Sequence, residues 1–535
     1  MVERFERDLP DRTRRTSAYY NSQRNNNPPR QPNMPDEEST SARSGIEGLP
    51  SGRLNIRTRM GRKPSSPMAP PFMVSAPGKA IVFGEHAVVH GKLAMAAAIS
   101  LRSYLLVTTL SKSHRTVTLN FRDIGLDHTW DIDSLPWAIF DHPSKKKFYY
   151  GSVTSLDPEL LEALRPHVAA VSPDKPEDVR KIHQNASNSF LYLFLSLGSR
   201  KTHAAIYTLR STIPTGAGLG SSASVAVCIS TALLLQLRTL SGPHEDQPAD
   251  EAELQLERIN RWAFVGELCI HGNPSGVDNT VSTGGKAVIF RRGDYHKPPT
   301  VIPILDFPEL PLLLINSRQP RSTSVEVAKV AALREARPAI TESILHSIDL
   351  VTTAAHEIIE SDAFTEPCSD NDNDNDAEEY TNGRSTASSV EQLGELFRIN
   401  HGLLVSLGTS HPRLERIREI VDQSDIGWTK LTGAGGGGCA ITLLKSNRDQ
   451  AAVERVEDQL NQEGFDIYKT VLGGDGVGVL WPAVLQNGTD EEGGEEIDQQ
   501  KFENVVGNEG LERLVGVGGP QDREGWKFWK RNPQA

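Results

Sequence analysis

The sequence predicts a mixed α+β protein, with an α/β arrangement of helices and strands in two lobes. Two observations lead to this fold class. Short strand-like apolar runs alternate with longer helical ones, and both halves of the chain contain both kinds of run. The length of 535 residues accommodates two ordinary domains together with additional polar segments. We expect the boundary between the lobes near residues 292–312.

The individual elements follow from the spacing of apolar residues along the chain. The strand-like runs are Lys79–Phe83, Tyr104–Leu110, Ala204–Leu209, Ala287–Phe290, Leu312–Ile315 and Ala440–Leu444. The helical runs are Ser222–Arg238, Glu251–Cys269, Val325–Leu333, Ile340–Ile359, Val390–Leu407 and Arg413–Gln423. These runs place the N-terminal lobe in residues 71–300 and the C-terminal lobe in residues 301–485.

Polar segments flank and interrupt the lobes. Residues 1–70 form a mildly basic arm and residues 486–535 a polar tail, and we expect the arm to be disordered and the tail mostly so, because they offer little apolar surface to bury. The tail ends in a cluster of aromatic and basic residues at Glu524–Arg531, which could dock on another surface.

An acidic insertion is expected at residues 361–389, between two helices. The aspartates that begin at Asp370 alternate as in a calcium-binding loop, but Asn375 and Thr381 stand where such a loop needs glycine and glutamate. A disordered acidic segment is the better interpretation.

Composition excludes several classes of function. The net charge of -12 argues against general nucleic-acid binding, which needs a basic face. No apolar run approaches the ~20 residues of a membrane span, and the N-terminus lacks the apolar region of a signal peptide. Four cysteines without CxxC spacing indicate reduced thiols in a cytoplasmic protein: Cys228, Cys269, Cys368 and Cys439.

The segment Pro214–Ala223 predicts a phosphate-binding loop. Three spaced glycines followed by two serines precede an apolar helical run, and glycine lets backbone N–H groups turn toward an anion at a helix N-terminus. The serines could instead cap the helix, or one of them could ligate Mg²⁺. The residues expected to hold the phosphates are Gly216, Ala217, Gly218, Leu219, Gly220, Ser221 and Ser222.

Other nucleotide-binding motifs fail. The chain has no Walker loop, and a formal match to the dinucleotide-binding fingerprint at Gly433, Gly435 and Gly438 precedes a strand rather than a helix. We therefore interpret this second glycine-rich turn as backbone that closely approaches either a ligand or another chain segment.

A third segment, Ser75–Gly91, places Lys79 at the start of a strand, directly after a Pro-Gly turn. Glu85 and His86 stand at the end of the same strand, where α/β proteins tend to bind ligands.

Together, these segments resemble the signature motifs of the GHMP small-molecule kinases. The matching strings, in order, are Pro77–Lys79 with Gly84–His86, Pro214–Ala223 and Leu431–Cys439. The resemblance covers roughly residues 72–482 apart from the acidic insertion. It implies a GHMP kinase fold, with an N-terminal ATP-binding lobe, a C-terminal ferredoxin-like lobe and an active site in the cleft between them.

Within this family, Ile270–Asn279 and Gly84–Gly91 favour the subgroup that phosphorylates mevalonate at its C5 hydroxyl, an early step of isoprenoid and sterol biosynthesis. The resemblance also implies a homodimer and feedback inhibition by isoprenyl diphosphates. The alternatives are another GHMP kinase that acts on phosphomevalonate or a sugar, and a catalytically silent regulatory protein of this fold. A silent regulatory protein would be expected to lose some of the residues that the family uses for catalysis. This chain keeps all four of them: Lys79, Ser222, Glu267 and Asp278.

The resemblance also implies a role for each catalytic residue. Asp278 accepts the proton of the substrate hydroxyl, and Lys79 lies beside it and contacts both substrates. Ser222 and Glu267 ligate Mg²⁺, which accompanies ATP as the cofactor.

Further residues are assigned to the substrates by the same resemblance. Glu85, His86 and Thr323 belong to the mevalonate pocket, and Ser211 lies near the nucleotide. Asp123 stands where the family has an asparagine near the adenine.

Overall fold

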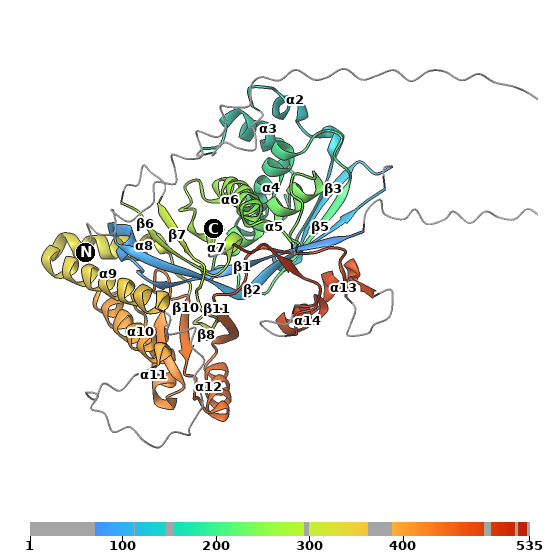
Figure 1. Cartoon of the computed structure of the whole chain (residues 1–535). Helices are drawn as coiled ribbons and strands as arrows, with labels where there is room; N and C mark the ends of the chain where they lie inside the picture. Colours follow the sequence, from blue (N-terminus) through green and yellow to red (C-terminus); the bar gives the residue numbers. More distant parts are fainter. Residues whose placement is uncertain are drawn as a thin grey trace, which may run out of the picture. The chain divides into compact units, whose positions relative to one another are not determined.

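The computed structural model describes residues 70–111, 113–145, 153, 155–244, 246–293, 299–361, 388–485, 494–518 and 523–531 (Figure 1). The predicted N-terminal arm and acidic insertion lie almost entirely outside these residues. No helix in the described ranges has the length and apolar character needed to cross a membrane.

The N-terminal lobe is built on a long antiparallel hairpin of β1 (Phe72–Phe83) and β2 (Leu93–Thr109). The other edge of β2 pairs with β6 along its first half and with β5 along its second half. The other strands of this lobe are β3 (Thr116–Phe121), β4 (Leu126–Asp131), β5 (Ala205–Ser211), β6 (Ala287–Arg291) and β7 (Thr300–Ile304).

Helices of the N-terminal lobe pack on this sheet around α5 (Ser221–Gln236). Almost every residue from Ala223 to Leu235 is buried, because α5 contacts β1 and β2 on one side and other helices on the other. The remaining helices here are α2 (Trp137–Phe140), α3 (Pro158–Ala169), α4 (Glu177–Leu197), α6 (Ala249–His271) and α7 (Val277–Gly284). Short 3₁₀ turns are η1 (Ala87–His90), η2 (Arg122–Ile124) and η3 (Ile132–Ser134).

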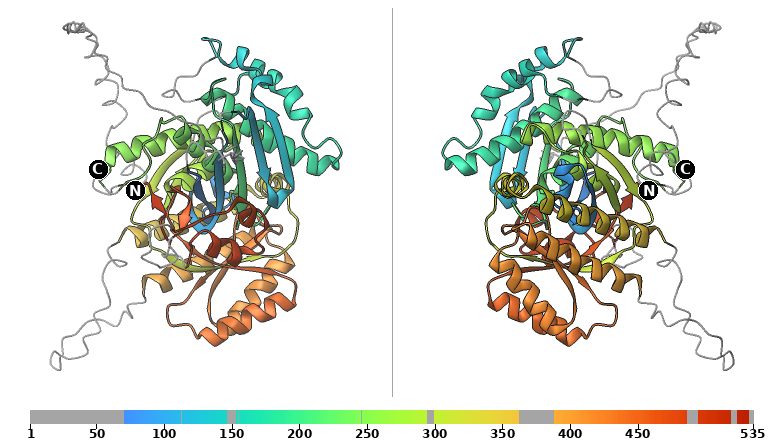
Figure 2. Two further views of the ribbon diagram at one scale, coloured as in Figure 1. Left: turned by 90° about the vertical axis from the view of Figure 1, so that its right-hand side faces the viewer. Right: turned by 90° about the vertical axis from the view of Figure 1, so that its left-hand side faces the viewer.

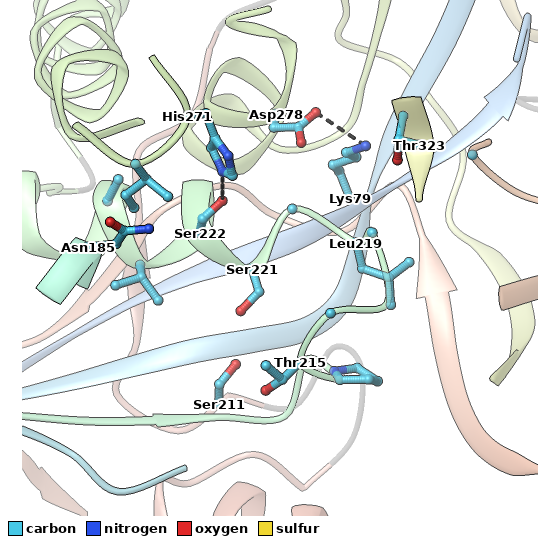
Figure 3. A pocket seen from close by; sticks show the side chains of 18 of the residues that line it. Lys79, Asn185, Ser211, Thr215, Leu219, Ser221, Ser222, His271, Asp278 and Thr323 are labelled. Atoms are coloured by element: carbon cyan, nitrogen blue, oxygen red, sulfur yellow. Dashed lines mark hydrogen bonds and ion pairs between the residues drawn. The ribbon is translucent and has the colours of Figure 1, made fainter. Parts of the chain in front are cut away.

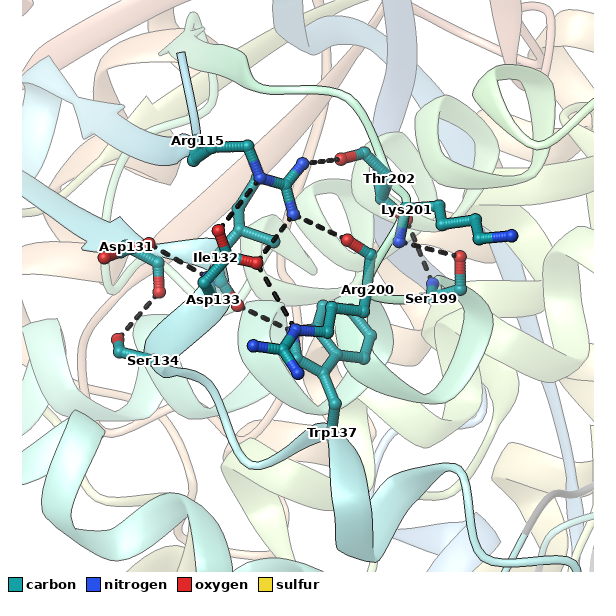
Figure 4. Close-up of polar contacts among 10 residues, drawn as sticks. All are labelled: Arg115, Asp131, Ile132, Asp133, Ser134, Trp137, Ser199, Arg200, Lys201 and Thr202. Atoms are coloured by element: carbon teal, nitrogen blue, oxygen red, sulfur yellow. Dashed lines mark hydrogen bonds and ion pairs between the residues drawn. The ribbon is translucent and has the colours of Figure 1, made fainter. Parts of the chain in front are cut away.

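A polar cluster ties the loop before β5 to η3 (Figure 4). Arg115 donates to both carboxylate oxygens of Asp133, at 3.1 and 3.0 Å, and to the carbonyl oxygen of Thr202 at 3.2 Å. These residues do not line the cavity that is described in the next subsection, so we interpret the cluster as structural.

The C-terminal lobe has the β-α-β-β-α-β order that the ferredoxin-like prediction requires. Its four strands lie in the order β11-β8-β10-β9 and are all antiparallel. They are β8 (Leu310–Asn316), β9 (Gly427–Leu431), β10 (Cys439–Leu444) and β11 (Asp466–Leu472). Its helices are α8 (Thr323–Ala336), α9 (Pro338–Glu360), α10 (Ser389–Ser406), α11 (Pro412–Ser424) and α12 (Gln450–Gln462).

The two lobes share one sheet, because Leu472 of β11 pairs with Ile99 of β2. Along the chain, β7 is the last strand that pairs within the N-terminal lobe, where its partner is β6. The next strand, β8, pairs with β10 and β11 of the C-terminal lobe. All the strands and helices predicted from apolar spacing are present. Elements of the two lobes that had not been predicted are β3, β4, β7, β9, β11, α2, α3, α4, α7 and α12.

The segment after residue 485 departs from the expected disorder. Phe502, Leu511 and Trp526 are buried against Met73 of β1 and neighbouring residues of the sheet. Figure 2 shows this red segment beside the blue strands. This segment has few apolar residues, but several of them are large and pack together against β1 and β2. The elements at this end are β12 (Gly478–Leu480), β13 (Val484–Leu485), β14 (Glu495–Glu496), α13 (Gln499–Asn504), α14 (Asn508–Leu514) and β15 (Lys527–Phe528).

Candidate active site

The loop before α5 opens onto a cavity of about 750 Å³. Gly216, Gly218 and Gly220 all have φ between +70° and +78°, in the left-handed region that glycine adopts readily. Among the described residues, no group accepts a hydrogen bond from the N–H groups of these glycines. The loop therefore presents free donors to the cavity, as an anion site requires.

The serines of this loop do not cap α5. Gly220 is the N-cap residue, and no side chain in the described part of the chain caps this end of the helix. Ser221 and Ser222 form its first turn, and both line the cavity. The capping interpretation is thus wrong, and the Ser222 hydroxyl contacts Nε2 of His271 instead.

Lys79 is fixed beneath the same loop. Its backbone N–H donates to the carbonyl oxygen of Leu219 at 2.8 Å, and a Cβ atom on the preceding Gly78 would lie only 2.9 Å from that oxygen. This close contact brings the Lys79 side chain to the cavity, where its Nζ lies 3.2 Å from Oδ1 of Asp278 (Figure 3). Asp278 belongs to the first turn of α7.

Glu267 is a buried carboxylate in the last turns of α6, with only 3% of its surface exposed. Its Oε1 has no hydrogen-bond partner within the described residues. Burial, and then the charge of Asp278, raise the pKa of Glu267 to about 8. Ser222 opposes this shift, and its Oγ lies 3.1 Å from Nε2 of His271.

These donors fit Mg²⁺. A hard cation prefers oxygen ligands and takes one or two carboxylates, with phosphate oxygens and water as the others. The unpartnered oxygen of Glu267 beside the Ser222 hydroxyl meets that requirement. Clusters of three or more His, Cys, Asp or Glu side chains that could hold a metal are absent from the described residues.

Glu85 and His86 adjoin the cavity, but their polar atoms face the C-terminal lobe. The Glu85 carboxylate forms a fully buried ion pair with Lys430 of β9 and accepts a hydrogen bond from Nδ2 of Asn400 at 3.0 Å. Nε2 of His86 lies 2.8 Å from the carbonyl oxygen of Ala434, and burial lowers the pKa of this imidazole. Thr323, the first residue of α8, also lines the cavity.

Ser211 and Asp123 both line the cavity and lie next to each other. The carboxylate of Asp123 accepts hydrogen bonds from the backbone N–H of Ser211 at 2.6 Å and from Nε of Arg210 at 2.9 Å. The Ser211 hydroxyl lies 3.1 Å from that of Ser103. Both side chains are therefore engaged within the protein.

Several cavity residues had no role assigned from the sequence, among them Arg321 and Asn185. Arg321 donates to the carbonyl oxygens of Ala217 at 3.1 Å and Thr432 at 3.3 Å, so it links the glycine-rich loops of the two lobes. The only sequence signal for Arg321 was its position two residues before Thr323, which the resemblance assigns to the substrate pocket. Asn185 of α4 also lines the cavity, and no sequence pattern singled it out.

Comparisons with known proteins identify the family of the chain. The model of the GHMP kinases N terminal domain matches residues 186–286, and that of the GHMP kinases C terminal matches residues 385–466. The chain is 69% identical over 500 residues to the mevalonate kinase erg12 of Aspergillus fumigatus, which covers 94% of this chain and 89% of that protein. It is 62% identical over 481 residues to the mevalonate kinase ERG12 of Gibberella zeae, with 89% and 91% covered.

Solved structures show the same fold at lower identity. The crystal structure of L. major mevalonate kinase in complex with R-mevalonate superposes with a TM-score of 0.51 at 20% identity and covers 74% of this chain and 94% of that one. A second crystal structure of a mevalonate kinase gives a TM-score of 0.50 at 21% identity, with 75% and 98% covered.

Proposed function

Because the chain belongs to the mevalonate kinases of the GHMP kinase family, we propose that its cavity carries out phosphoryl transfer with Lys79 and Asp278 at the acceptor hydroxyl. The enzyme transfers the γ-phosphoryl group of ATP to the C5 hydroxyl of mevalonate, giving 5-phosphomevalonate and ADP. This reaction is an early step of isoprenoid and sterol biosynthesis. The observation that carries the assignment is the 3.2 Å pair of Lys79 and Asp278 beside a loop of free N–H donors.

The loop at Gly216–Ser222 binds the phosphates of ATP. Its free N–H groups and the N-terminus of α5 supply fixed partial positive charge, which attracts an anion without reorganisation of the protein. Ser222 and Glu267 would hold Mg²⁺. When bound, this ion neutralises negative charge on the phosphates.

Asp278 takes the proton of the acceptor hydroxyl onto its carboxylate. The Lys79 ammonium, held against the same carboxylate, stabilises the negative charge that develops on the hydroxyl oxygen as the proton leaves. Because Lys79 is anchored through its own backbone to Leu219, the acceptor and the phosphate loop keep a fixed spacing. Such positioning is a large part of catalysis in phosphoryl transfer.

Thr323, His86 and Glu85 form the wall of the mevalonate pocket. Thr323 offers a hydroxyl to the substrate, whereas His86 and Glu85 shape the wall through their bonds to the C-terminal lobe. Ser211 supports the nucleotide side through its bond to Asp123.

The wider assignments rest on the resemblance to the family. We propose an ATP-binding lobe at 71–300, a C-terminal lobe at 301–485 and a homodimer. The apolar side of the cavity suits feedback inhibition by isoprenyl diphosphates. Free thiols at Cys228, Cys269 and Cys439 suit a cytoplasmic enzyme.

The assignment of Asp278 is tested by Asp278→Ala. Loss of a general base should lower kcat by at least about 100-fold. ATP affinity, measured by displacement of a fluorescent ADP analogue, should change little, because Asp278 lies on the acceptor side. Near-normal turnover would remove Asp278 from this role. Wild-type protein that phosphorylates phosphomevalonate or galactose in preference to mevalonate would contradict the substrate assignment.

A further inference from the structure

The cavity has two ends on either side of the phosphate loop. Figure 3 shows Lys79, Asp278 and Thr323 toward one side of Ser222, and Asn185 on the opposite side. A nucleotide whose phosphates lie on the loop, with the γ-phosphate toward Lys79 and Asp278, therefore extends its base toward Asn185.

The surroundings of Asn185 suit a flat aromatic base. Ile182 and Ala186 flank Asn185 on α4, and α5, the end of α6 and β5 add further apolar residues to the lining of the same cavity: Val225, Ile229, Ile270 and Leu209. Ligand pockets of this kind use a few placed polar groups to set orientation and specificity.

Other polar groups on this side are already engaged. Asp123 is bound to Arg210 and to the backbone of Ser211, and the Ser189 hydroxyl donates to the carbonyl oxygen of Gly266 at 3.1 Å. In contrast, no described residue forms a hydrogen bond or ion pair with the side chain of half-buried Asn185. Its amide is thus a free donor and acceptor in an apolar setting.

We infer that Asn185 reads the adenine base of ATP. A side-chain amide presents one acceptor and one donor, which match the 6-amino group and the adjacent ring nitrogen of adenine. Guanine offers two acceptors, O6 and N7, on the corresponding edge, so it would leave the amide oxygen without a donor. The inference rests on the proposed binding of ATP phosphates at Gly216–Ser222, and it makes Asn185 a determinant of nucleotide specificity.

The test combines a change in the protein with a change in the ligand. The dissociation constants of ATP and of its 6-deamino analogue, purine riboside triphosphate, are measured by displacement of N-methylanthraniloyl-ADP from the full-length chain without mevalonate. Asn185→Ala should weaken ATP binding about tenfold, because two hydrogen bonds are lost. It should weaken binding of the 6-deamino analogue only about threefold, because this ligand keeps the ring nitrogen and loses a single hydrogen bond. The preference for ATP over GTP should also become smaller.

Asn188→Ala is the matched control. Asn188 lies on the same helix and is also half-buried, but it does not line the cavity, so ATP affinity should stay at the wild-type value. The inference is overturned if Asn185→Ala binds ATP normally, or if it loses affinity equally for ATP and the 6-deamino analogue. Wild-type protein that fails to bind ATP would instead overturn the proposed phosphate site itself.

Discussion

The loop before α5 and the loop before β10 are both rich in glycine, but a side chain added to each would meet different surroundings. A Cβ atom on Gly216 would have nothing within 4 Å. A Cβ atom on Gly435 or Gly436 would overlap Thr409 or Glu326, and one on Gly437 would lie 2.5 Å from the carbonyl oxygen of Gln319. In the first loop, the atoms nearest to a Cβ atom on Gly218 or Gly220 would belong to side chains, chiefly those of Arg321 and Lys79. In the second loop, the overlaps include backbone oxygens, which cannot move aside as a side chain can.

Hydrogen bonding separates the two loops in the same way. The N–H groups of Gly436 and Gly438 donate to the carbonyl oxygens of Thr409 at 2.7 Å and Gln319 at 3.0 Å. The first loop keeps its N–H groups free, and a helix rather than a strand follows it. Similar compositions therefore give one loop whose glycine N–H groups are free to bind an anion and another whose N–H groups donate to carbonyl oxygens within the C-terminal lobe.

The largest effect on stability is expected from a methyl group in the packed loop. Gly435→Ala combines a steric overlap with a left-handed backbone, so we expect it to lower the free energy of unfolding by about 4 kcal/mol. Urea unfolding and the yield of soluble protein measure this loss. Gly408→Ala is the matched control, since Gly408 has a similar φ but nothing within 4 Å of an added Cβ. Equal stability of the two variants would show that close packing is not the reason for Gly435.

In the loop before α5, the expected effect is on catalysis rather than on stability. Ser222→Ala should lower kcat or the apparent affinity for Mg²⁺ by roughly 10- to 100-fold, because it removes the hydroxyl beside Glu267. The free energy of unfolding should hardly change, since the hydroxyl does not cap α5. Kinetics over a range of Mg²⁺ concentrations, together with thermal unfolding, separate the two quantities. A variant that is less stable but fully active would restore the capping role.

The contrast also shows what the sequence could predict. Glycine spacing and the apolar run of α5 are local signals, so the loop and helix were predicted correctly from them. The partners of Glu85 could not be predicted, because Lys430 and Asn400 come from distant elements of the other lobe. The proximity of Lys79 and Asp278 came from the family resemblance, since no local pattern joins β1 to α7.

The C-terminal segment was missed for a different reason. Its composition is polar overall, and composition predicts order only through the average amount of apolar surface. A few large side chains such as Trp529, which is 3% exposed and donates to Gln255 of α6 at 3.0 Å, are enough to hold it when the rest of the fold offers a place to bury them.

A smaller effect is expected where the two loops meet. Arg321 donates to a carbonyl oxygen in each loop, and the ammonium of a lysine lacks the planar fork that reaches both. Arg321→Lys should therefore lower kcat/KM by about tenfold, the loss of a single positioning interaction. Arg318→Lys is the control, because Arg318 precedes the same helix but binds Asp466 at the surface. Equal activity of both variants would mean that the loops are positioned independently of Arg321.

The smallest effect is expected at the most open position of the first loop. Gly216→Ala introduces no clash, so its only cost is the left-handed backbone of an alanine, about 1 kcal/mol in the free energy of unfolding. Gly216→Asn should recover part of that loss, because asparagine adopts this conformation more easily. Urea unfolding measures the stability of both variants, and nucleotide displacement measures their ATP affinity. If asparagine restores stability and affinity together, backbone conformation alone explains this glycine. If it restores stability but not affinity, the phosphates approach Gly216 too closely for any side chain. The loop before α5 and the loop before β10 would then both need glycine because a Cβ atom does not fit.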